Sequence, residues 1–375
     1  MSTLKGKKVL VTGATGFIGG RIVERLVLEQ RAEVRAMVRD FSRAARLARF
    51  DCVKMVKAAL SDRIAIEDAV DGCDVVFHCA YDWKSKTHNL DGIRLLTEAC
   101  IRHNVRLVHL SSIAVYEPLK DGELDETEKS LPSGLTYTDT KIEIEEEIFR
   151  KIVGQGLKAV ILQPTIVYGP FSPWTITPVQ QLLSGRVILP DEGKGLCNAV
   201  YVDDVCEAMI LSTSQDGGVG ERFLISGAEP VSWGDFFGAY ETILGVKAIS
   251  YMSEDEIRKT LRNPVSNLKL LLADPKRITQ WKLTRDFAFF LLDNLPDWAE
   301  SGVMALFSRY QKIAPRPTYL PSNHLLNIYS ANCRVRIDKA KRLLGYEPKY
   351  DLSRGMELTA EYINWAFPRF NDLKT

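Results

Sequence analysis

The stretch VLVTGATGFIGG, from Val9 to Gly20, decides the fold. It begins with three apolar residues, as a buried strand does, and glycines follow at positions 13, 16 and 19. From Phe17 onward, apolar residues recur at helical spacing. The glycines therefore stand at a strand-to-helix turn, where the amides of a helix N-terminus can hold the pyrophosphate of a dinucleotide. The alternative is a glycine-rich turn that binds no ligand.

Each glycine has its own predicted role in such a turn. Gly13 makes the tight turn, Gly16 lets the backbone approach the phosphates, and Gly19 lets the helix lie close to the sheet.

The composition limits the other function classes. The chain has 375 residues, enough for one large or two ordinary domains, and 46% of them are hydrophobic. The 49 Lys and Arg nearly balance the 48 Asp and Glu, so charge gives no case for a nucleic acid or an acidic membrane as partner. Because no run of about 18 apolar residues occurs, we expect no membrane span. The N-terminus leaves no room for a signal peptide before the first strand, so we expect a soluble, cytoplasmic protein.

The cysteines and histidines indicate neither disulfides nor a metal. Seven cysteines are scattered without a C-x-x-C pair, and the five histidines include no H-E-x-x-H motif. We therefore predict buried thiols in a reducing compartment and no metal site.

Strand-like runs alternate with helical patterns through the first half of the chain. The expected strands after the first are 33–38, 53–57, 74–79 and 105–110, and the clearest helices are 90–103 and 141–153. This alternation predicts an α/β fold, a Rossmann-type doubly wound parallel sheet with helices on both faces. In such sheets ligands bind beyond the carboxyl ends of the strands, so the residues after each strand are the informative ones.

Arg39 and Asp40 follow the second strand, about twenty residues past the last glycine. An acidic residue at this place holds the ribose 2′-hydroxyl of NAD, and an arginine holds the 2′-phosphate of NADP. Because arginine comes first and Arg43 and Arg46 follow, we favour NADP over NAD. The alternative is that Arg39 pairs with Asp40 at the surface and Asp40 takes the ribose of NAD.

Small and aromatic residues end the next strands. Ala80 suits a strand end that passes under a cofactor, while Tyr81 and Trp83 either line a substrate or are ordinary aromatic packing. After the third strand, Asp62 is expected to cap the following helix.

Tyr137 and Lys141 lie four residues apart at the start of a predicted helix, after a strand that ends in Ser111 and Ser112. Residues at i and i+4 share a helix face, and a cation beside a phenol lowers the phenol's pKa from about 10, which favours proton transfer near neutral pH. The second Y-x-x-x-K match, Tyr116 with Lys120, is discarded because Pro118 prevents a helix there.

Ser112, Tyr137 and Lys141 match in order and spacing the Ser-Tyr-Lys set of the extended short-chain dehydrogenases/reductases, the NAD-dependent epimerase/dehydratase family. Further segments resemble the family's motifs: LQPTIVYGP (162–170), VYVDDV (200–205) and DKAKRLLGYEP (338–348). Within the family, the V-R-D end of the second strand and the long apolar C-terminal region resemble dihydroflavonol-reductase-like and 3β-hydroxysteroid-dehydrogenase-like members.

The resemblance implies a role for each matched residue. Tyr137 is the acid/base, Ser112 binds the reacting oxygen, and Lys141 binds the nicotinamide ribose and tunes Tyr137. The implied cofactor contacts are Gly13, Thr15, Gly16, Phe17, Ile18, Gly19, Arg39, Asp40, Leu60, Ala80, Tyr137, Lys141, Pro164, Ile166 and Val167. The implied substrate contacts are Tyr81, Trp83, Ser112, Ile113 and Tyr168. The family also implies a homodimer formed through helices 90–103 and 137–153.

Such a site transfers a hydride between a secondary alcohol or ketone and the nicotinamide of NADP or NAD while Tyr137 moves the proton. Ile113 and Ala114 stand where family dehydratases carry an Asp-Glu pair, so dehydration is disfavoured. Gln163 stands where nucleotide-sugar enzymes often carry an Asn that bonds the substrate diphosphate, which weakens that alternative. We therefore expect an oxidoreductase acting on a small or apolar molecule. The alternatives are a nucleotide-sugar epimerase with tightly bound NAD and a non-catalytic dinucleotide-binding sensor.

The expected domain division follows the motifs. Residues 1–165 with about 196–227 are the expected dinucleotide-binding domain, and 166–195 with 228–375 a smaller, mostly helical substrate-binding region. A helical insertion is expected at about 251–326, either an apolar cap over a hydrophobic substrate or a few extra packed helices.

Overall fold

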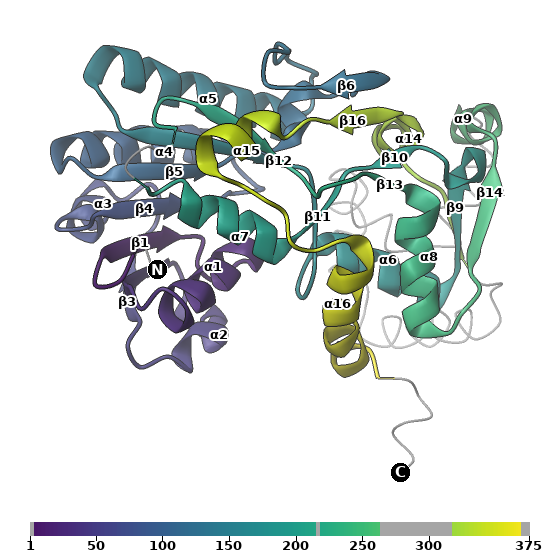
Figure 1. Cartoon of the computed structure of the whole chain (residues 1–375), viewed down its shortest axis with the longest axis horizontal. Coiled ribbons are helices and arrows are strands. Elements are labelled where there is room, and N and C mark those ends of the chain that lie inside the picture. Colours follow the sequence, from purple (N-terminus) through teal and green to yellow (C-terminus); the bar gives the residue numbers. More distant parts are fainter. Residues whose placement is uncertain (1–3, 215–217, 263–316, 369–375) are drawn as a thin grey trace, which may run out of the picture. The chain divides into compact units, whose positions relative to one another are not determined.

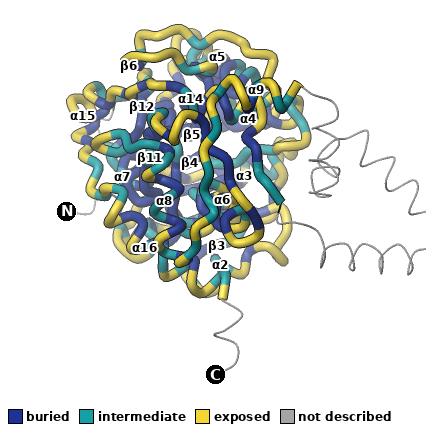
Figure 2. The backbone as a smooth tube through the Cα atoms, turned by 90° about the vertical axis from the view of Figure 1, so that its right-hand side faces the viewer, coloured by how far each residue is buried: buried dark blue, intermediate teal, exposed yellow. Residues whose placement is uncertain are grey.

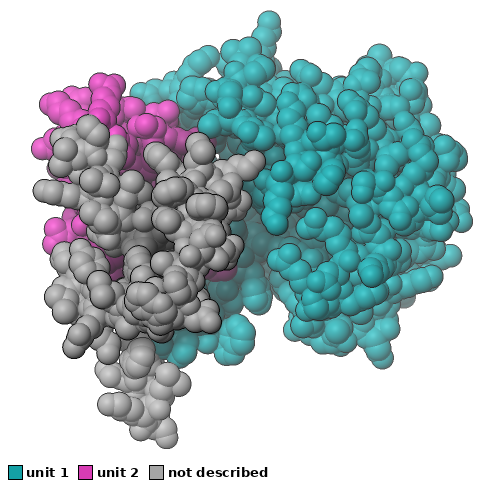
Figure 3. Space-filling model, turned by 180° about the vertical axis from the view of Figure 1, so that it is seen from behind, with its two compact units in different colours: residues 1–175, 196–231, 332–375 teal, residues 176–195, 232–331 magenta. Residues whose placement is uncertain are grey.

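The computed structural model describes residues 4–214, 218–262 and 317–368. The chain divides into two compact units, one of residues 1–175, 196–231 and 332–375 and one of residues 176–195 and 232–331 (Figure 3). The substrate-binding role expected for the C-terminal region stays a prediction.

The first unit contains a seven-stranded parallel sheet in the order β12-β7-β5-β4-β1-β2-β3 (Figure 1). Its strands are β1 (Lys8–Thr12), β2 (Glu33–Val38), β3 (Lys54–Lys57), β4 (Val75–His78), β5 (Arg106–Leu110), β7 (Ala159–Pro164) and β12 (Arg222–Ile225). The order departs from β1 in both directions, as in a doubly wound fold. The predicted Rossmann-type sheet is therefore confirmed.

The central strands are apolar because helices cover both of their faces. β4 is buried over its full length and β5 over all but its first residue, and both appear dark blue in the tube of Figure 2. Successive side chains point to opposite faces of a strand, so Val9 and Val11 face away from Leu10.

The helices follow the strands closely. They are α1 (Phe17–Leu28), α2 (Ala45–Ala48), α3 (Arg63–Val70), α4 (Lys86–Arg102), α5 (Thr136–Gln155), α6 (Pro173–Ser184), α7 (Val202–Leu211), α8 (Trp233–Leu244), α9 (Glu254–Arg262), α14 (Asn323–Ser330), α15 (Asp338–Leu344) and α16 (Leu352–Ala366). Two helices begin earlier than predicted. α4 begins at Lys86 because the hydroxyl of Ser85 caps it at the amide of His88, and α5 begins at Thr136. Asp62 caps α3 at the amide of Ala65, as predicted.

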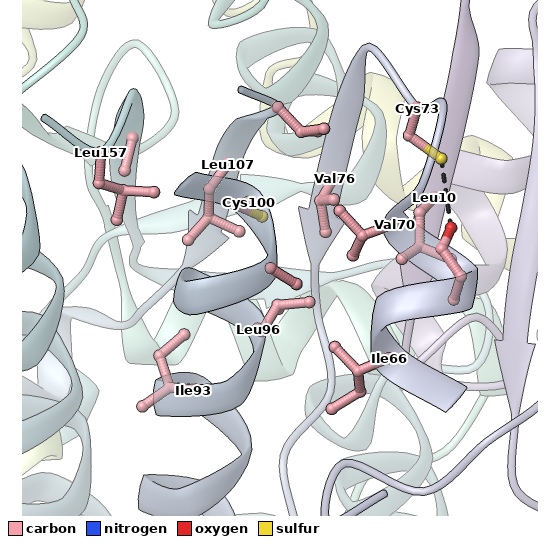
Figure 4. Close-up of a cluster of buried hydrophobic side chains, with 14 of the residues drawn as sticks. Leu10, Ile66, Val70, Cys73, Val76, Ile93, Leu96, Cys100, Leu107 and Leu157 are labelled. Atoms are coloured by element: carbon pink, nitrogen blue, oxygen red, sulfur yellow. Dashed lines mark hydrogen bonds between the residues drawn. The ribbon is translucent and has the colours of Figure 1, made fainter. Parts of the chain in front are cut away.

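One large hydrophobic cluster joins α3, α4 and α5 to the sheet. Figure 4 shows its centre, where Ile93 and Leu96 of α4 approach Val76 of β4 and Leu107 of β5. Leu10 of β1 belongs to the same cluster, so these three helices cover the face to which Leu10 points.

α1 and α7 pack against each other through side-chain ion pairs as well as apolar residues. Arg21 donates to both carboxylate oxygens of Asp203, at 2.5 and 2.8 Å. Asp204 accepts from the backbone amides of Lys349 and Tyr350, at 2.8 and 3.2 Å. The two aspartates of the VYVDDV segment thus fix α7 to α1 and to the segment that precedes α16.

Short ladders complete the first unit. β8 (Ile166–Tyr168) pairs with β11 (Ala199–Tyr201), and β6 (Gly122–Leu124) pairs with β16 (Cys333–Val335). β10 (Leu196–Cys197) pairs with β13 (Val231–Ser232).

The second unit holds a small parallel sheet that the sequence did not predict. Its strands are β9 (Arg186–Pro190), β14 (Ile249–Met252) and β15 (Thr318–Tyr319), in the order β14-β9-β15. An aromatic core lies within this unit, where Trp233 and Phe237 of α8 contact Tyr329 of α14. Most of the predicted insertion, with its apolar residues from Phe287 to Phe307, lies outside the described residues.

Candidate active site

The carboxyl ends of β1, β4, β5 and β7 bring the predicted site residues together at one edge of the first unit's sheet. At the end of β1, Gly13 has a φ of +66°, and a Cβ on it would lie 2.7 Å from the backbone nitrogen of Ala80. A Cβ on Gly19 would collide with the carbonyl oxygen of Gly13. Glycine is therefore required at both positions, one for the turn and one for the close approach of α1.

The N-terminus of α1 fits an anionic group. Its N-cap residue, Gly16, supplies no side-chain cap, and the first turn carries no acidic residue. Thr15 and Gly16 are exposed, and Phe17 and Ile18 are half-buried. A helix N-terminus with open amides and a surrounding glycine turn is suited to a pyrophosphate.

The turn after β2 carries Arg39 and Asp40. Asp40 accepts from the amide of Ser42 at 2.9 Å and from its hydroxyl at 2.7 Å, and these bonds hold the pKa of the Asp40 carboxyl below its usual range. The Arg39 side chain is 66% exposed, and its nearest described anion is Asp82, at 3.9 Å. The alternative surface pair between Arg39 and Asp40 is absent from the ion pairs of the described residues, while Asp40 caps the short helical turn Phe41–Arg43.

Further predicted cofactor contacts lie around this edge. Ala80 follows β4, and its amide donates to the hydroxyl of Thr12 at 3.3 Å. Leu60 is half-buried. It packs on the sheet face that α3, α4 and α5 cover, against Gly92 of α4. Along the chain after β7, Pro164 and Val167 are buried and Ile166 is half-buried.

Ser112, Tyr137 and Lys141 meet beyond the carboxyl end of β5. Ser112 caps a short helical turn (Ile113–Tyr116), and its side chain lies close enough to the Tyr137 hydroxyl to lower the pKa of the phenol. Lys141, one turn along α5 from Tyr137, donates its ammonium to the backbone oxygen of Leu110 at 2.8 Å. Its Nζ lies 6.0 Å from the centre of the Tyr137 ring.

Burial controls the protonation of this site. It raises the pKa of Tyr137 to about 12, against the smaller lowering effect of Ser112, and it lowers the pKa of Lys141 to about 8. The predicted lowering of the phenol's pKa by Lys141 is not seen in this structure, where desolvation of the phenolate is the largest effect on Tyr137. At pH 7 Tyr137 is a phenol and Lys141 mostly an ammonium ion, a state suited to giving a proton to a carbonyl oxygen.

Two aromatic residues of the β4–α4 loop lie against Tyr137. The ring of Trp83 stacks on that of Tyr137, with centroids 4.9 Å apart and an angle of 14° between the planes. Tyr81 packs edge-on to both rings, at 5.0 and 4.9 Å. Trp83 is nevertheless 75% exposed, so these rings form an open aromatic wall beside the phenol.

Two other predicted substrate contacts are not supported by the geometry. Tyr168 is 1% exposed, and its hydroxyl donates to the backbone oxygen of Asp351 at 3.2 Å. Ile113 is 5% exposed. Both side chains are covered by the protein, which a motif match alone does not reveal.

Gln163 is also fully buried, with both ends of its amide bonded to protein groups. Its nitrogen donates to the two oxygens of Glu145 at 2.9 and 3.0 Å, and its oxygen accepts from the Tyr116 hydroxyl at 2.9 Å. Gln163 thus has no free group for a substrate diphosphate.

Sequence reasoning missed Glu145, which lies directly beneath the site. It is 3% exposed and also accepts a hydrogen bond from Ser111. Its position four residues after Lys141, on the same face of α5, is the signal that would have revealed it.

Three further observations concern metal ligands, cysteines and membrane-spanning helices. Among the described residues, no group of three or more His, Cys, Asp or Glu is arranged to hold a metal ion. All seven cysteines are free, and Cys52 is exposed where a buried thiol was expected. In the described part of the chain, no helix is both long enough and apolar enough for a membrane span.

Known proteins resemble the chain in sequence and in fold. It is 27% identical to a 4-hydroxy-2-methyl-3-oxo-4-farnesyl-3,4-dihydroquinoline-1-oxide ketoreductase of Stigmatella aurantiaca, over 64% of this chain and 74% of that protein. It is 25% identical to dihydroflavonol 4-reductase of Arabidopsis thaliana, over 82% and 86%. The crystal structure of UDP-glucose 4-epimerase from Thermotoga maritima superposes with a TM-score of 0.66 at 20% identity, over 96% of this chain and 99% of that one.

The sequence profile of the NAD dependent epimerase/dehydratase family matches residues 9–226, from the first strand to beyond the end of the seven-stranded sheet. This match covers more than half of the chain and includes Ser112, Tyr137 and Lys141. The chain therefore belongs to the NAD dependent epimerase/dehydratase family, a family of enzymes.

Proposed function

We propose that this protein is a ketoreductase or alcohol dehydrogenase that prefers NADP and acts on a secondary alcohol or ketone of a small or apolar molecule. The observation that carries the proposal is the convergence of Ser112, Tyr137 and Lys141 at the end of β5, together with an α1 N-terminus that has neither a side-chain cap nor an acidic residue in its first turn. The bound nicotinamide supplies or accepts the hydride. The Ser112 hydroxyl orients the substrate oxygen, Tyr137 gives it a proton, and the Lys141 ammonium favours the phenolate that remains.

The preference for NADP rests on the turn after β2. The Asp40 carboxylate is engaged by Ser42, whereas the Arg39 guanidinium is exposed and lies 3.9 Å from its nearest described anion. A planar guanidinium in this place suits a 2′-phosphate.

The choice of substrate class rests on what surrounds Tyr137. Tyr81 and Trp83 offer apolar ring surface, and Ile113 and Ala114 bring no proton-transferring group. Since Gln163 is fully engaged, this position does not supply a polar contact for a nucleotide diphosphate.

The test begins with the nucleotide content of the purified protein, followed by titration with NADPH and NADH. We expect an empty protein that binds NADPH more tightly than NADH and consumes it with ketone substrates. NAD that is released only on denaturation would overturn the proposal and favour a nucleotide-sugar epimerase. Binding of dinucleotide without turnover of any carbonyl or sugar nucleotide would favour a non-catalytic sensor.

The epimerase is the second candidate because the fold is shared with UDP-glucose 4-epimerase and the family includes such enzymes. We also propose a cytoplasmic location and a homodimer formed through α4 and α5. Light scattering that returned a mass near 42.2 kDa, that of one chain, would contradict the dimer.

A further inference from the structure

A buried polar cluster lies beneath Ser112 and Lys141, and none of the roles above uses it. We call it the Glu145 cluster; its members are Ser111, Tyr116, Glu145, Gln163 and Arg222. Ser111 donates to one Glu145 oxygen, Gln163 donates to both, and Tyr116 donates to Gln163. The Arg222 guanidinium lies 3.9 Å from Glu145 and 5.9 Å from the Tyr116 ring.

Two contacts fasten α5 to the last residues of β5 and the residue after it. Lys141 donates to the backbone oxygen of Leu110, and one turn later Glu145 accepts from the side chain of Ser111. Ser112 is the next residue, and its side chain lies close enough to Tyr137 of the same helix to lower the pKa of the phenol. The Glu145 carboxylate therefore fixes the backbone from which Ser112 projects.

The negative charge of the Glu145 carboxylate also acts on the pKa of Lys141. The other titratable groups that face Lys141 come from β4 and β5 and from the residue after β4: burial lowers the pKa of His78 to about 3 and that of His109 well below its usual value, and raises the pKa of Cys79 to about 12. All three are neutral at pH 7. The Tyr137 phenol is neutral as well, and so is that of Tyr81, whose ring centre lies 5.2 Å from the Lys141 Nζ, because burial raises the pKa of both phenols. Glu145 is the acidic group whose charge raises the pKa of Lys141 against burial.

Burial and the polar neighbours of Glu145 act on the pKa of its carboxyl in opposite directions, and burial has the larger effect. Burial raises the pKa of the Glu145 carboxyl, while the hydrogen bonds from Ser111 and Gln163 and the charges of Arg222 and Lys141 lower it. Its two hydrogen-bond donors, Ser111 and Gln163, are neutral. The cations that compensate Glu145 are therefore Arg222, at 3.9 Å, and the buried ammonium of Lys141.

We propose that Glu145 is a positioning residue for the proposed reaction: its carboxylate fixes Ser111, and with it Ser112, and keeps Lys141 in its charged form. This inference rests on the proposed roles of Ser112 and Lys141. It assigns Glu145 no contact with the substrate.

The test is Glu145→Gln, which keeps the shape of the side chain and removes its charge. The Lys141 signal in lysine-labelled protein, identified by its loss in Lys141→Arg, is titrated by NMR in wild type and variant. We expect the pKa of Lys141 to fall by about one unit from its value of about 8. The high-pH limb of kcat/KM should shift to lower pH by the same amount, which is a loss of about fivefold at pH 8, because the charged fraction of Lys141 falls from about one half to about one eleventh.

Glu147→Gln is the matched control. Glu147 lies on the same helix, is 3% exposed and forms an ion pair with Arg150. The Glu147→Gln variant should leave the Lys141 titration and the pH profile of kcat/KM unchanged, even if its melting temperature is lower than that of the wild type. An unmoved Lys141 titration in Glu145→Gln, or an equal shift in Glu147→Gln, overturns the proposal.

A second variant keeps the positioning role testable if Glu145→Gln does not fold. Glu145→Asp retains the charge but withdraws it from Ser111, so we expect a Lys141 titration close to wild type and a several-fold lower kcat. Wild-type kcat in this variant contradicts the positioning role. The NMR titration needs no substrate, so a protein that reduces no ketone yet shows the shift in Glu145→Gln would refute the proposed function and leave the link between Glu145 and Lys141 standing.

Discussion

The two ends of the proposed cofactor groove are built differently. At the catalytic end, Lys141 and Ser111 are each 4% exposed and are bonded to β5 and α5. At the opposite end, Arg39 and Asp40 lie on an exposed turn, and the Arg39 side chain is 66% exposed. The proposed catalytic residues thus lie in packed surroundings, whereas the residues proposed to set the cofactor preference have only a few surface contacts.

This difference predicts how each end responds to substitution. In the buried end a lost contact leaves a neighbouring polar group without a partner, which costs about 1–3 kcal/mol or more. In the exposed end water replaces the lost contact, so effects are smaller and confined to binding. The cofactor preference can therefore change by one or two substitutions that leave the catalytic groups undisturbed.

The largest effect is expected from Tyr137→Phe, which removes the hydroxyl and little else. Loss of a general acid costs a factor of about 10²–10⁴, so we expect kcat/KM to fall by about a thousandfold while NADPH affinity stays within about twofold. Tyr346→Phe is the control, because it removes another buried hydroxyl, one that donates to the backbone of Ser226 at 2.8 Å. Turnover by Tyr137→Phe at the wild-type rate would show that Tyr137 is not the acid/base.

The second-largest effect is expected on the free energy of unfolding at acidic pH. It depends on the buried histidines His78 and His109, so it can be measured without a substrate. His78 and His109 stack with centroids 5.2 Å apart, and within the described residues neither ring nitrogen of His109 has a hydrogen-bond partner. Burial lowers the pKa of both rings, that of His78 to about 3, so below about pH 6.5 the unfolded chain binds protons that the folded one does not. Stability is therefore full above that pH and falls as pH decreases, by about 1.4 kcal/mol per unit for each histidine.

Urea denaturation at pH 7 and pH 5 measures this slope. His109→Leu should reduce this slope by about 1.4 kcal/mol per pH unit, which is the contribution of one histidine. Equal slopes in wild type and His109→Leu would show that His109 does not stay neutral in the folded protein.

The sequence predicts the parts of this site that depend on spacing. Gly13 and Gly19 stand where their backbones require glycine, and Tyr137 and Lys141 lie one turn apart on α5, as the alternation of strands and helices implies. Burial is what the motifs do not contain. Tyr168 was expected at the substrate, but α16, nearly two hundred residues later in the chain, covers it: its ring closely contacts Gly355.

Charge balance is equally hidden from a motif. The pKa of Tyr137 depends on how far water is excluded around the phenol, which is a property of the packed site rather than of the Tyr-Lys spacing. For Glu145, the position four residues after Lys141 is visible in the sequence. Its hydrogen bonds from Ser111 and Gln163, which indicate its role, are visible only in the folded structure.

A smaller effect is expected at the exposed end from Arg39→Ala. Loss of a charge-assisted contact to a 2′-phosphate costs about 1.4 kcal/mol, so the Kd for NADPH should rise about tenfold and that for NADH should not change. Fluorescence titration with both cofactors measures this. Arg43→Ala, which removes a neighbouring exposed cation, should weaken NADPH binding by no more than about twofold. Equal losses for NADPH and NADH in Arg39→Ala would place Arg39 outside the 2′-phosphate site.

The smallest effect is expected from Trp83→Ala, at the border between the two kinds of region. The indole stacks on Tyr137 at 4.9 Å but is 75% exposed, so its removal frees one face of the phenol without opening the core. Because an aromatic contact contributes about 0.5–1.5 kcal/mol, we expect KM for an aromatic ketone to rise about threefold or more with kcat nearly unchanged. Trp365→Ala is the matched control, since Trp365 is equally exposed and packs on another tyrosine, Tyr362. If Trp83→Ala and Trp365→Ala change KM by the same factor, Tyr81 and Trp83 are ordinary packing residues, and the substrate approaches Tyr137 from another side.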